Sequence, residues 1–257
     1  MPPWRRRHTL ALFPSRPLFP LHNFYSALLL CLLLNIFSSL LTVASELCIL
    51  DGRQMEEQKV LYDLGCGEGG VARAAIALGW KVIGIDNQPQ PNYPGEFVLA
   101  DATKLTGLPV GDLAWASPDC QGYSRITALK PETAKPRLVP EFRESCKRLS
   151  SNYVIENVPG CYDLEVNLKL CGAMFELPII RWRWFETTFF IPQLATPPKP
   201  RHFLQVCGKC KGSLKEWQDA MGLPGMSRRG LAQAVPFAYT WYILTWFNIW
   251  PKEVKHE

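Results

Sequence analysis

The segment from Lys59 to Asp86 has the order strand, glycine turn, helix, strand. The short apolar run KVLYDLG precedes the turn CGEGG, VARAAIALG has helical composition and ends at Gly79, and KVIGID is again short and apolar. This is the order of a βαβ unit, in which a helix connects two parallel strands. The sequence therefore predicts an α/β protein with a nucleotide-type parallel sheet.

Two further strands are expected after this unit, and both end at residues with reactive or charged side chains. EFVLADAT supplies a strand that ends at Asp101, and DLAWASPDC delivers Cys120 to the loop beyond its carboxyl end. Asp86 closes the second strand about 20 residues after the glycine turn, where an acidic side chain can bind ribose hydroxyls. Ligands of open α/β sheets bind at the carboxyl ends of the strands, so Asp63, Asp86, Asp101 and Cys120 are expected to converge.

The glycine turn restricts the ligand that the sheet would bind. GCGEGG at 65–70 has neither the usual spacing of the dinucleotide fingerprint nor the Lys-Ser/Thr of a P-loop. Glu68 within the turn would repel a pyrophosphate, which favours a ligand that is cationic or uncharged near the loop. S-adenosylmethionine fits because it carries a sulfonium and an amino group and no phosphate.

Five short stretches between about Lys59 and Ile243 are informative as an ordered set. They are the glycine turn with the acidic end of the next strand and ADAT, the loop SPDCQGYSR, VIENVPG at 154–160, Arg181-Trp-Arg183 with FET at 185–187, and AVPFAYTWYI at 234–243. In this order they resemble the cytosine-C5 DNA methyltransferase family, especially its compact phage and orphan forms. The resemblance implies a Rossmann-like S-adenosylmethionine-dependent methyltransferase sheet with a small irregular target-recognition insert. It also implies methyl transfer to C5 of cytosine in DNA.

The resemblance assigns Cys120 as the nucleophile, Glu156 as the acid at N3 of the base, and Arg181 and Arg183 as supports for the base and the glutamate. The residue types suit this chemistry. A thiolate can add at C6 and later leave, and a carboxylic acid in a desolvated pocket can donate to N3. The two arginines are two residues apart on a predicted strand and would share a face. The target cytosine would have to flip out of the duplex to reach them.

The resemblance also implies two sets of binding residues. The expected cofactor-binding residues are Asp63, Leu64, Gly65, Gly67, Gly69, Asp86, Asp101, Ala102 and Pro118. The expected nucleic-acid contacts are Gln121, Ser124, Asn157, Arg201 and Arg228. Double-stranded DNA is the expected partner of a monomeric enzyme, and no metal is expected.

Cys207-Gly-Lys-Cys210 has metal-like spacing, but no fourth ligand is evident beside His202, so a glycine turn with two thiols is favoured over a zinc knuckle.

Two positions depart from the family pattern. Asp119 stands where a second proline usually precedes the cysteine, which frees the loop backbone and puts a carboxylate beside the thiol. That carboxylate is expected to raise the pKa of the cysteine. Gly65 replaces the aromatic residue of Asp-Leu-Phe-Cys-Gly. These departures motivate one alternative, a catalytically impaired DNA-binding remnant, and methylation of RNA or a nucleotide on the same scaffold is another. Genome marking and protection against restriction are both compatible roles.

Residues 1–54 differ from the rest of the chain. The range 24–45 has no charged side chain over 22 positions and follows Arg5-Arg6-Arg7, so it is long enough to span a bilayer with its N-terminal side in the cytoplasm. A cleaved signal ending near Thr42-Val43-Ala44 and an over-extended reading frame before Met55 are the other interpretations. The dispensable extension is favoured because the cofactor and substrate are cytosolic. The expected location is the cytoplasm, that of the host for a phage protein, with membrane anchoring through 24–45 as the alternative.

The length of 257 residues suits one α/β domain with a small appendage. The expected divisions are a cofactor-binding and catalytic core at 55–160, a small target-recognition region at 161–229 and a C-terminal helix at 230–257 that returns to the core. The net charge of +5 is by itself a weak argument for nucleic acid, which needs clustered phosphate contacts. Nine scattered cysteines indicate a reducing compartment.

Overall fold

The computed structural model describes residues 58–123, 135–198, 202–208 and 210–250. The N-terminal range 1–54 with its apolar segment 24–45 lies outside the described residues, as do the expected nucleic-acid contacts Ser124 and Arg201. Within the described ranges, no helix has both the length and the apolar character needed to cross a bilayer.

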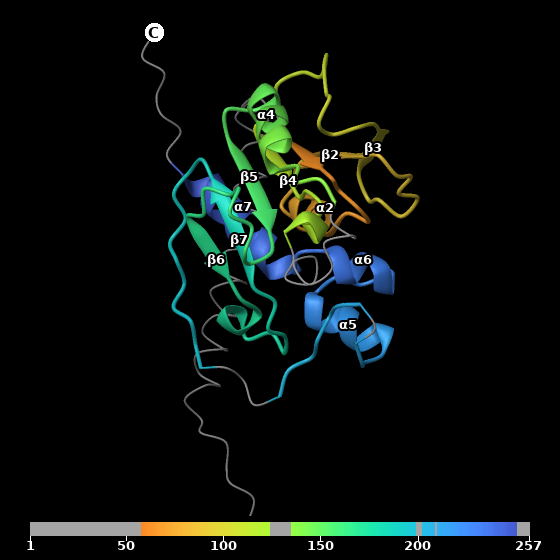
Figure 1. The fold of residues 1–257 in the computed structure, drawn as a ribbon, viewed down its shortest axis with the longest axis vertical. Coiled ribbons are helices and arrows are strands. Elements are labelled where there is room, and N and C mark those ends of the chain that lie inside the picture. The colour runs from red at the N-terminus through yellow and green to blue at the C-terminus, as the bar shows by residue number, and fades with distance from the viewer. Residues whose placement is uncertain (1–57, 124–134, 199–201, 209, 251–257) are drawn as a thin grey trace, which may run out of the picture. The chain divides into compact units, whose positions relative to one another are not determined.

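One mixed sheet organises the described part of the chain (Figure 1). Its strands lie in the order β3-β2-β1-β4-β5-β7-β6; the first five in this order run parallel, and β7 is antiparallel to both β5 and β6. Their bounds are β1 (Val60–Leu64), β2 (Lys81–Asp86), β3 (Glu96–Leu99), β4 (Leu113–Ala116), β5 (Tyr153–Asn157), β6 (Leu168–Leu170) and β7 (Arg183–Thr187). The prediction of an α/β protein with a parallel sheet is confirmed.

Helices pack on both faces of this sheet. Helices α2 (Gly70–Ala77) and α7 (Phe237–Ile249) contribute to one apolar core, in which they contact each other, and α4 (Val139–Leu149) contributes to the other. Side chains alternate along a strand, so Leu61 and Asp63 of β1 face α2 and α7, whereas Tyr62 and Leu64 face α4. The buried residues of α4 recur at helical spacing, which explains its position: Val139, Phe142, Cys146 and Leu149.

The range 161–229, expected to recognise the target, contributes to two parts of the structure. Strands β6 and β7 extend the main sheet, whereas α5 (Leu214–Met221) and α6 (Arg228–Gln233) pack around a separate small core that includes Trp217 and Leu231. Helix α5 begins with a capping box between Ser213 and Glu216 and ends at Gly222, whose φ of 65° suits a helix stop. The helix therefore stops within LKEWQDAMGLPG, at the first of its two glycines.

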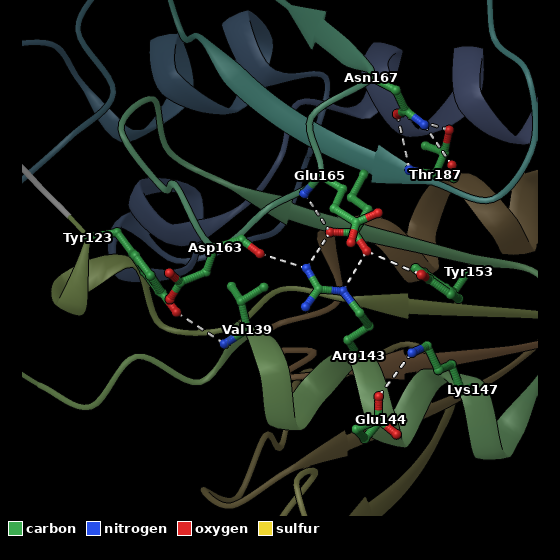
Figure 2. A network of polar contacts seen from close by, with 11 residues as sticks. Tyr123, Val139, Arg143, Glu144, Lys147, Tyr153, Asp163, Glu165, Asn167 and Thr187 are labelled. Atoms are coloured by element: carbon green, nitrogen blue, oxygen red, sulfur yellow. Dashed lines mark hydrogen bonds and ion pairs between the residues drawn. The ribbon is translucent and has the colours of Figure 1, made fainter.

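A buried ion pair connects α4 to β7 (Figure 2). Arg143 donates from Nε and Nη2 to the two carboxylate oxygens of Glu186, both at 2.6 Å, and the side chains are 15% and 4% exposed. Arg143 also donates to the carbonyl of Asp163, and Glu186 accepts from the backbone N–H of Glu165 and the hydroxyl of Tyr153. Although burial opposes it, hydrogen bonding from Arg143 lowers the pKa of Glu186. The network fixes the crossover helix against the end of the sheet that carries β7.

Replacing Arg143 with alanine is expected to lower the free energy of unfolding by about 3–5 kcal/mol, because Glu186 would remain as an uncompensated buried charge. A carboxylate with a depressed pKa contributes stability above its unfolded pKa and loses it as the pH falls through the folded pKa. The difference between wild type and variant should therefore narrow below about pH 4. Denaturant unfolding at pH 7 and at low pH measures both effects.

Lys147→Ala is the matched control on the same helix. Lys147 pairs with Glu144 at 3.0 Å on the exposed side of α4, where solvent weakens the interaction (Figure 2). This variant should leave stability essentially unchanged. If Arg143→Ala and Lys147→Ala lowered the free energy of unfolding equally, the stabilising role of the buried ion pair would be contradicted.

Candidate active site

The loop that carries Cys120 follows β4 and begins with a short 3₁₀ helix, Cys120–Gly122. Asp119 caps this helix: its Oδ1 accepts from the backbone N–H of Gln121 at 2.8 Å, and its Oδ2 pairs with Lys135 at 3.2 Å. Where the family has a rigid proline, this chain therefore has an acidic cap with a basic partner. The hydrogen bond fixes the start of the 3₁₀ helix, and the ion pair joins Asp119 to Lys135.

Cys120 is exposed to solvent, with a sulfur that neighbouring protein atoms partly desolvate. This desolvation raises the pKa of the thiol, and the negative charges of Glu156 and Asp119 add to the effect, while Arg183 and Arg181 oppose it. The direction expected from Asp119 is therefore found, although burial and Glu156 have larger effects. The positive charges of Arg183 and Arg181 are thus the features of this site that favour the thiolate form of Cys120.

Glu156 lies at the carboxyl end of β5, next to β4 in the sheet. Its Oε1 is 2.5 Å from Nε of Arg183 on β7, and the two side chains are 7% and 11% exposed. Burial raises the pKa of Glu156, and the positive charges of Arg183 and Arg181 only partly offset this. The site therefore contains a carboxyl group that retains its proton more readily than an exposed one.

Asn157 connects the two strand ends. Its side-chain Nδ2 donates to the carbonyl of Pro118 at 3.0 Å, and its Oδ1 accepts from the backbone N–H of Val158 at 2.9 Å. Asn157 is buried, so its amide links the Cys120 loop to the end of β5. Asn157 was expected to contact nucleic acid, and in this structure its side chain holds the backbone of the Cys120 loop.

The two arginines occupy different environments. Strand β7 begins at Arg183, so Arg181 lies just before the strand on which both were predicted. Arg181 is buried and donates to the backbone carbonyls of Val206 at 2.5 Å, Ala232 at 2.6 Å and Ala234 at 3.1 Å. Burial lowers the pKa of Arg181 to about 9. Its guanidinium joins the segment before α5 to the segment that ends α6, and acts on Glu156 only through its charge.

The glycine turn lies at the carboxyl end of β1, the strand that pairs with β4 in the sheet. Gly67 donates its backbone N–H to Asp86 Oδ2 at 3.0 Å, and Gly65 donates to the carbonyl of Ile85 at 2.8 Å. Gly65 has a φ of 69°, and a Cβ atom there would lie 2.8 Å from the carbonyl oxygen of Ser117. The backbone therefore leaves no room for the aromatic residue of the family pattern. Gly67 also has a positive φ of 48°, but a Cβ atom there would meet nothing within 4 Å.

The remaining expected cofactor residues differ in exposure. Asp101 follows β3 and is exposed; its Oδ1 accepts from the backbone N–H and hydroxyl of Thr103, and these bonds lower its pKa. Gly69 has a φ of 79° and begins α2 as its N-cap. The other expected residues are buried around the strand ends: Leu64, Ala102 and Pro118.

Arg228, expected to contact DNA, instead lies against protein atoms. Its guanidinium lies 4.2 Å from the ring centroid of Trp217 and donates to the carbonyls of Cys210 and Gly212.

Cys207 and Cys210 have sulfur atoms 3.2 Å apart. Across the described residues, no group of three or more His, Cys, Asp or Glu side chains is arranged to hold a metal ion.

Glu68 has a role that sequence reasoning missed. Its carboxylate accepts from the backbone N–H of Ser227 at 2.8 Å and bonds the Ser227 hydroxyl, so the cofactor turn is tied to the start of α6. Ser227 before RRGLAQ is a recognisable N-cap. Its partner lies 159 residues earlier, and no local pattern could have identified it.

The chain was compared with known families, curated proteins and solved structures. No protein-family model matches the sequence, and no curated protein matches it significantly. Among solved structures, the methyltransferase EhMeth of Entamoeba histolytica is similar with a TM-score of 0.50 and 10% identity, over 75% of this chain and 98% of that chain. The Dnmt2 methyltransferase of S. pombe has a TM-score of 0.47 and 13% identity over 74% and 98%.

A prophage-encoded protein of E. coli, described as a DNA modification methyltransferase, has a TM-score of 0.38 and 21% identity over 50% of this chain. The match spans 45% of the length of that protein. At these identities the likeness concerns the fold alone. The chain has the Rossmann-like α/β fold of methyltransferases, as the sequence predicted.

Proposed function

We propose that this protein transfers a methyl group from S-adenosylmethionine to C5 of cytosine in DNA through a covalent adduct with Cys120. The observation that carries the proposal is the placement of Cys120 and Glu156 at the carboxyl ends of the neighbouring strands β4 and β5. Arg183, on the strand that pairs with β5 from the other side, contacts Glu156 directly. This placement supports roles for Cys120 as the nucleophile, Glu156 as the acid and Arg183 as the cation, since ligands of this fold bind at the carboxyl ends of the strands.

The residues at the glycine turn fit S-adenosylmethionine. Gly67 leaves open space above the turn, and Asp63 has a buried carboxylate oxygen without a hydrogen-bond partner among the described residues. No Lys-Ser/Thr pair is present in the turn to hold phosphates. Asp63, Gly65, Gly67, Asp86 and Asp101 would hold the cofactor, which supplies an electrophilic methyl group when bound.

Each catalytic side chain has a defined task in the proposed mechanism. The Cys120 thiolate adds to C6 of the flipped cytosine, which makes C5 nucleophilic enough to accept the methyl group. Glu156 holds a proton toward N3, where negative charge develops during the addition, and Arg183 keeps its carboxyl group in place. Loss of the C5 proton and expulsion of the thiolate then restore the ring and free the enzyme.

A cavity of about 720 Å³ lies beside Arg183, and neither Cys120 nor Glu156 is part of its lining. We propose that it holds a part of the nucleic acid next to the reacting cytosine. Its lining includes Pro159 after β5, Trp182 and Arg183 next to the sheet, and Phe203 and Gln205 from the range 161–229. This volume falls in the range of pockets that hold small molecules and cofactors. Aromatic, amide and guanidinium groups are also the side chains that stack on or hydrogen-bond to bases.

The test is to incubate the full chain with methyl-labelled S-adenosylmethionine and separate pools of duplex DNA, single-stranded RNA and free nucleotides, then identify the labelled nucleoside. Labelled 5-methyldeoxycytidine from the duplex pool is the expected result. Labelled RNA or nucleotide with unlabelled DNA would replace this proposal by the RNA or nucleotide alternative. Cofactor binding without transfer to any pool would support the non-catalytic remnant, an alternative favoured by the raised pKa of the Cys120 thiol.

A further inference from the structure

Tyr93 is a residue next to the cofactor turn that sequence reasoning did not identify. It lies between β2 and β3, and its ring occupies space that three glycines leave free. A Cβ atom on Gly84 would lie 2.2 Å from the Tyr93 ring, one on Gly69 would lie 3.0 Å from it and one on Gly95 3.1 Å. The ring therefore packs closely against β2 and against the residue that begins α2.

The hydroxyl of Tyr93 donates to Asp63 Oδ2 at 3.2 Å. Asp63 is 1% exposed, and its other oxygen, Oδ1, has no hydrogen-bond partner among the described residues. Leaving a buried carboxylate oxygen unpaired is costly, so such an atom indicates a missing partner. The neighbouring glycine turn indicates that this partner belongs to a ligand.

Several groups determine the charge on Asp63. Burial raises the pKa of Asp63 to about 7, the hydrogen bond from Tyr93 opposes this rise, and the charge of Asp86 on β2 adds to it. Cys66 in the turn also interacts with this carboxylate. On the helices that cover this face, α2 carries one charged residue, Arg73, and α7 carries none, and neither helix contributes to the shift. Tyr93 is thus the neighbour that favours the charged form of Asp63.

We propose that Tyr93 is a positioning residue that holds Asp63 through the hydrogen bond to Oδ2 and favours its charged form, so that Oδ1 faces the α-ammonium group at the amino-acid end of the cofactor. The inference rests on the proposed function, because it takes the ligand of the turn to be S-adenosylmethionine or its product. A hydrogen bond between an ammonium and a carboxylate is roughly twice as strong as a neutral one. Protonation of Asp63 would remove that advantage.

The experiment measures the dissociation constant of S-adenosylhomocysteine by calorimetry for the wild-type chain and Tyr93→Phe between pH 5.5 and pH 8. Phenylalanine keeps the ring and removes the hydroxyl. We expect the variant to bind about 3- to 10-fold more weakly near pH 6.5 and within about twofold of wild type at pH 8, since its binding midpoint moves to higher pH. The amine of the ligand titrates identically in both measurements, so the difference between the proteins reports on Asp63.

Two controls separate this role from a loss of packing. Tyr62→Phe removes a hydroxyl that donates to Pro109 on the other face of β1 and should keep the wild-type pH profile. Methylthioadenosine lacks the amino-acid end and should bind wild type and Tyr93→Phe equally at every pH. A carbon NMR titration of the Asp63 carboxyl without ligand should show a higher pKa in Tyr93→Phe.

The outcomes distinguish this inference from the proposed function. Superimposable pH profiles and equal Asp63 titrations for wild type and Tyr93→Phe would overturn the role of Tyr93, with cofactor binding intact. Failure of the wild-type chain to bind S-adenosylhomocysteine at any pH would overturn the proposed cofactor itself. In that case the ammonium proposal falls as well, whatever the NMR titration shows.

Discussion

Cys120→Ala is expected to lower the rate of methyl transfer by at least about four orders of magnitude, because the covalent route through C6 disappears with the nucleophile. Cofactor affinity should change little, since the glycine turn holds its shape through hydrogen bonds from its backbone N–H groups to the Ile85 carbonyl and the Asp86 carboxylate of β2. Duplex DNA containing 5-fluorocytosine provides a direct readout. Fluorine at C5 cannot leave as a proton does, so wild type should form an adduct that survives denaturation and Cys120→Ala should not.

Cys207→Ser is the matched control for this prediction. Among the described cysteines, Cys120 and Cys207 are the exposed ones, and Cys207 lines the cavity beside Arg183, so this change removes the other exposed thiol near the proposed centre. Under reducing conditions it should trap the fluorinated DNA as wild type does. If the adduct still formed with Cys120→Ala and was lost with Cys207→Ser, Cys207 would be the nucleophile and the assignment to Cys120 would be wrong.

Glu156→Gln is expected to lower kcat by about 10²- to 10⁴-fold, the range for loss of a positioned acid. Glutamine can occupy the same space and hydrogen-bond N3, but it has no proton to transfer, and it also ends the ion pair with Arg183. Because burial raises the pKa of Glu156, its protonated form persists to higher pH than in an exposed glutamate and is lost as the pH rises through that pKa. The wild-type rate should therefore contain a component that falls with rising pH, and this component should be absent in Glu156→Gln.

The pH dependence of kcat for both proteins, measured with saturating cofactor and DNA, checks this prediction. Glu144→Gln on the exposed side of α4 is the control, and it should match wild type at every pH. If Glu156→Gln kept a wild-type kcat, an acid at N3 would not be needed and the proposed mechanism would be incorrect. An unchanged pH profile with a reduced kcat would instead assign the titration to a different group.

Local sequence patterns were sufficient to predict the βαβ unit and the two strands that follow it. The apolar runs around CGEGG predicted β1, α2 and β2, and YVIEN coincides with β5. The parallel pairing of β1 with β2 follows from the βαβ order, because a crossover helix imposes that geometry. Among the described residues no helix separates β2 from β3 or β3 from β4, so the places of β3 and β4 in the sheet came from the tertiary structure. The strand ends at Cys120 and Glu156 then become neighbours through the pairing of β4 with β5.

Long-range partners could not be predicted in this way. Asp119 was expected to influence the thiol by its charge, but its hydrogen bond to Gln121 and its ion pair with Lys135 show that it also caps the loop. Arg181 was expected beside the base, yet its guanidinium binds backbone carbonyls of segments more than twenty residues away in sequence. A side chain such as arginine can satisfy either role, and only the packed backbone determines which acceptors lie within its reach.

The sequence by itself determined the class of the fold, the glycine turn and the strand ends that carry Cys120 and Glu156, because hydrophobic periodicity and glycine act within a few residues. The tertiary structure alone decided that Arg183 binds Glu156, that Glu68 reaches Ser227 and that Tyr93 bonds Asp63. Each of these contacts joins residues between 27 and 159 positions apart. Their formation depends on how the sheet and its loops pack, since the free energy of a buried charge depends on which partners surround it.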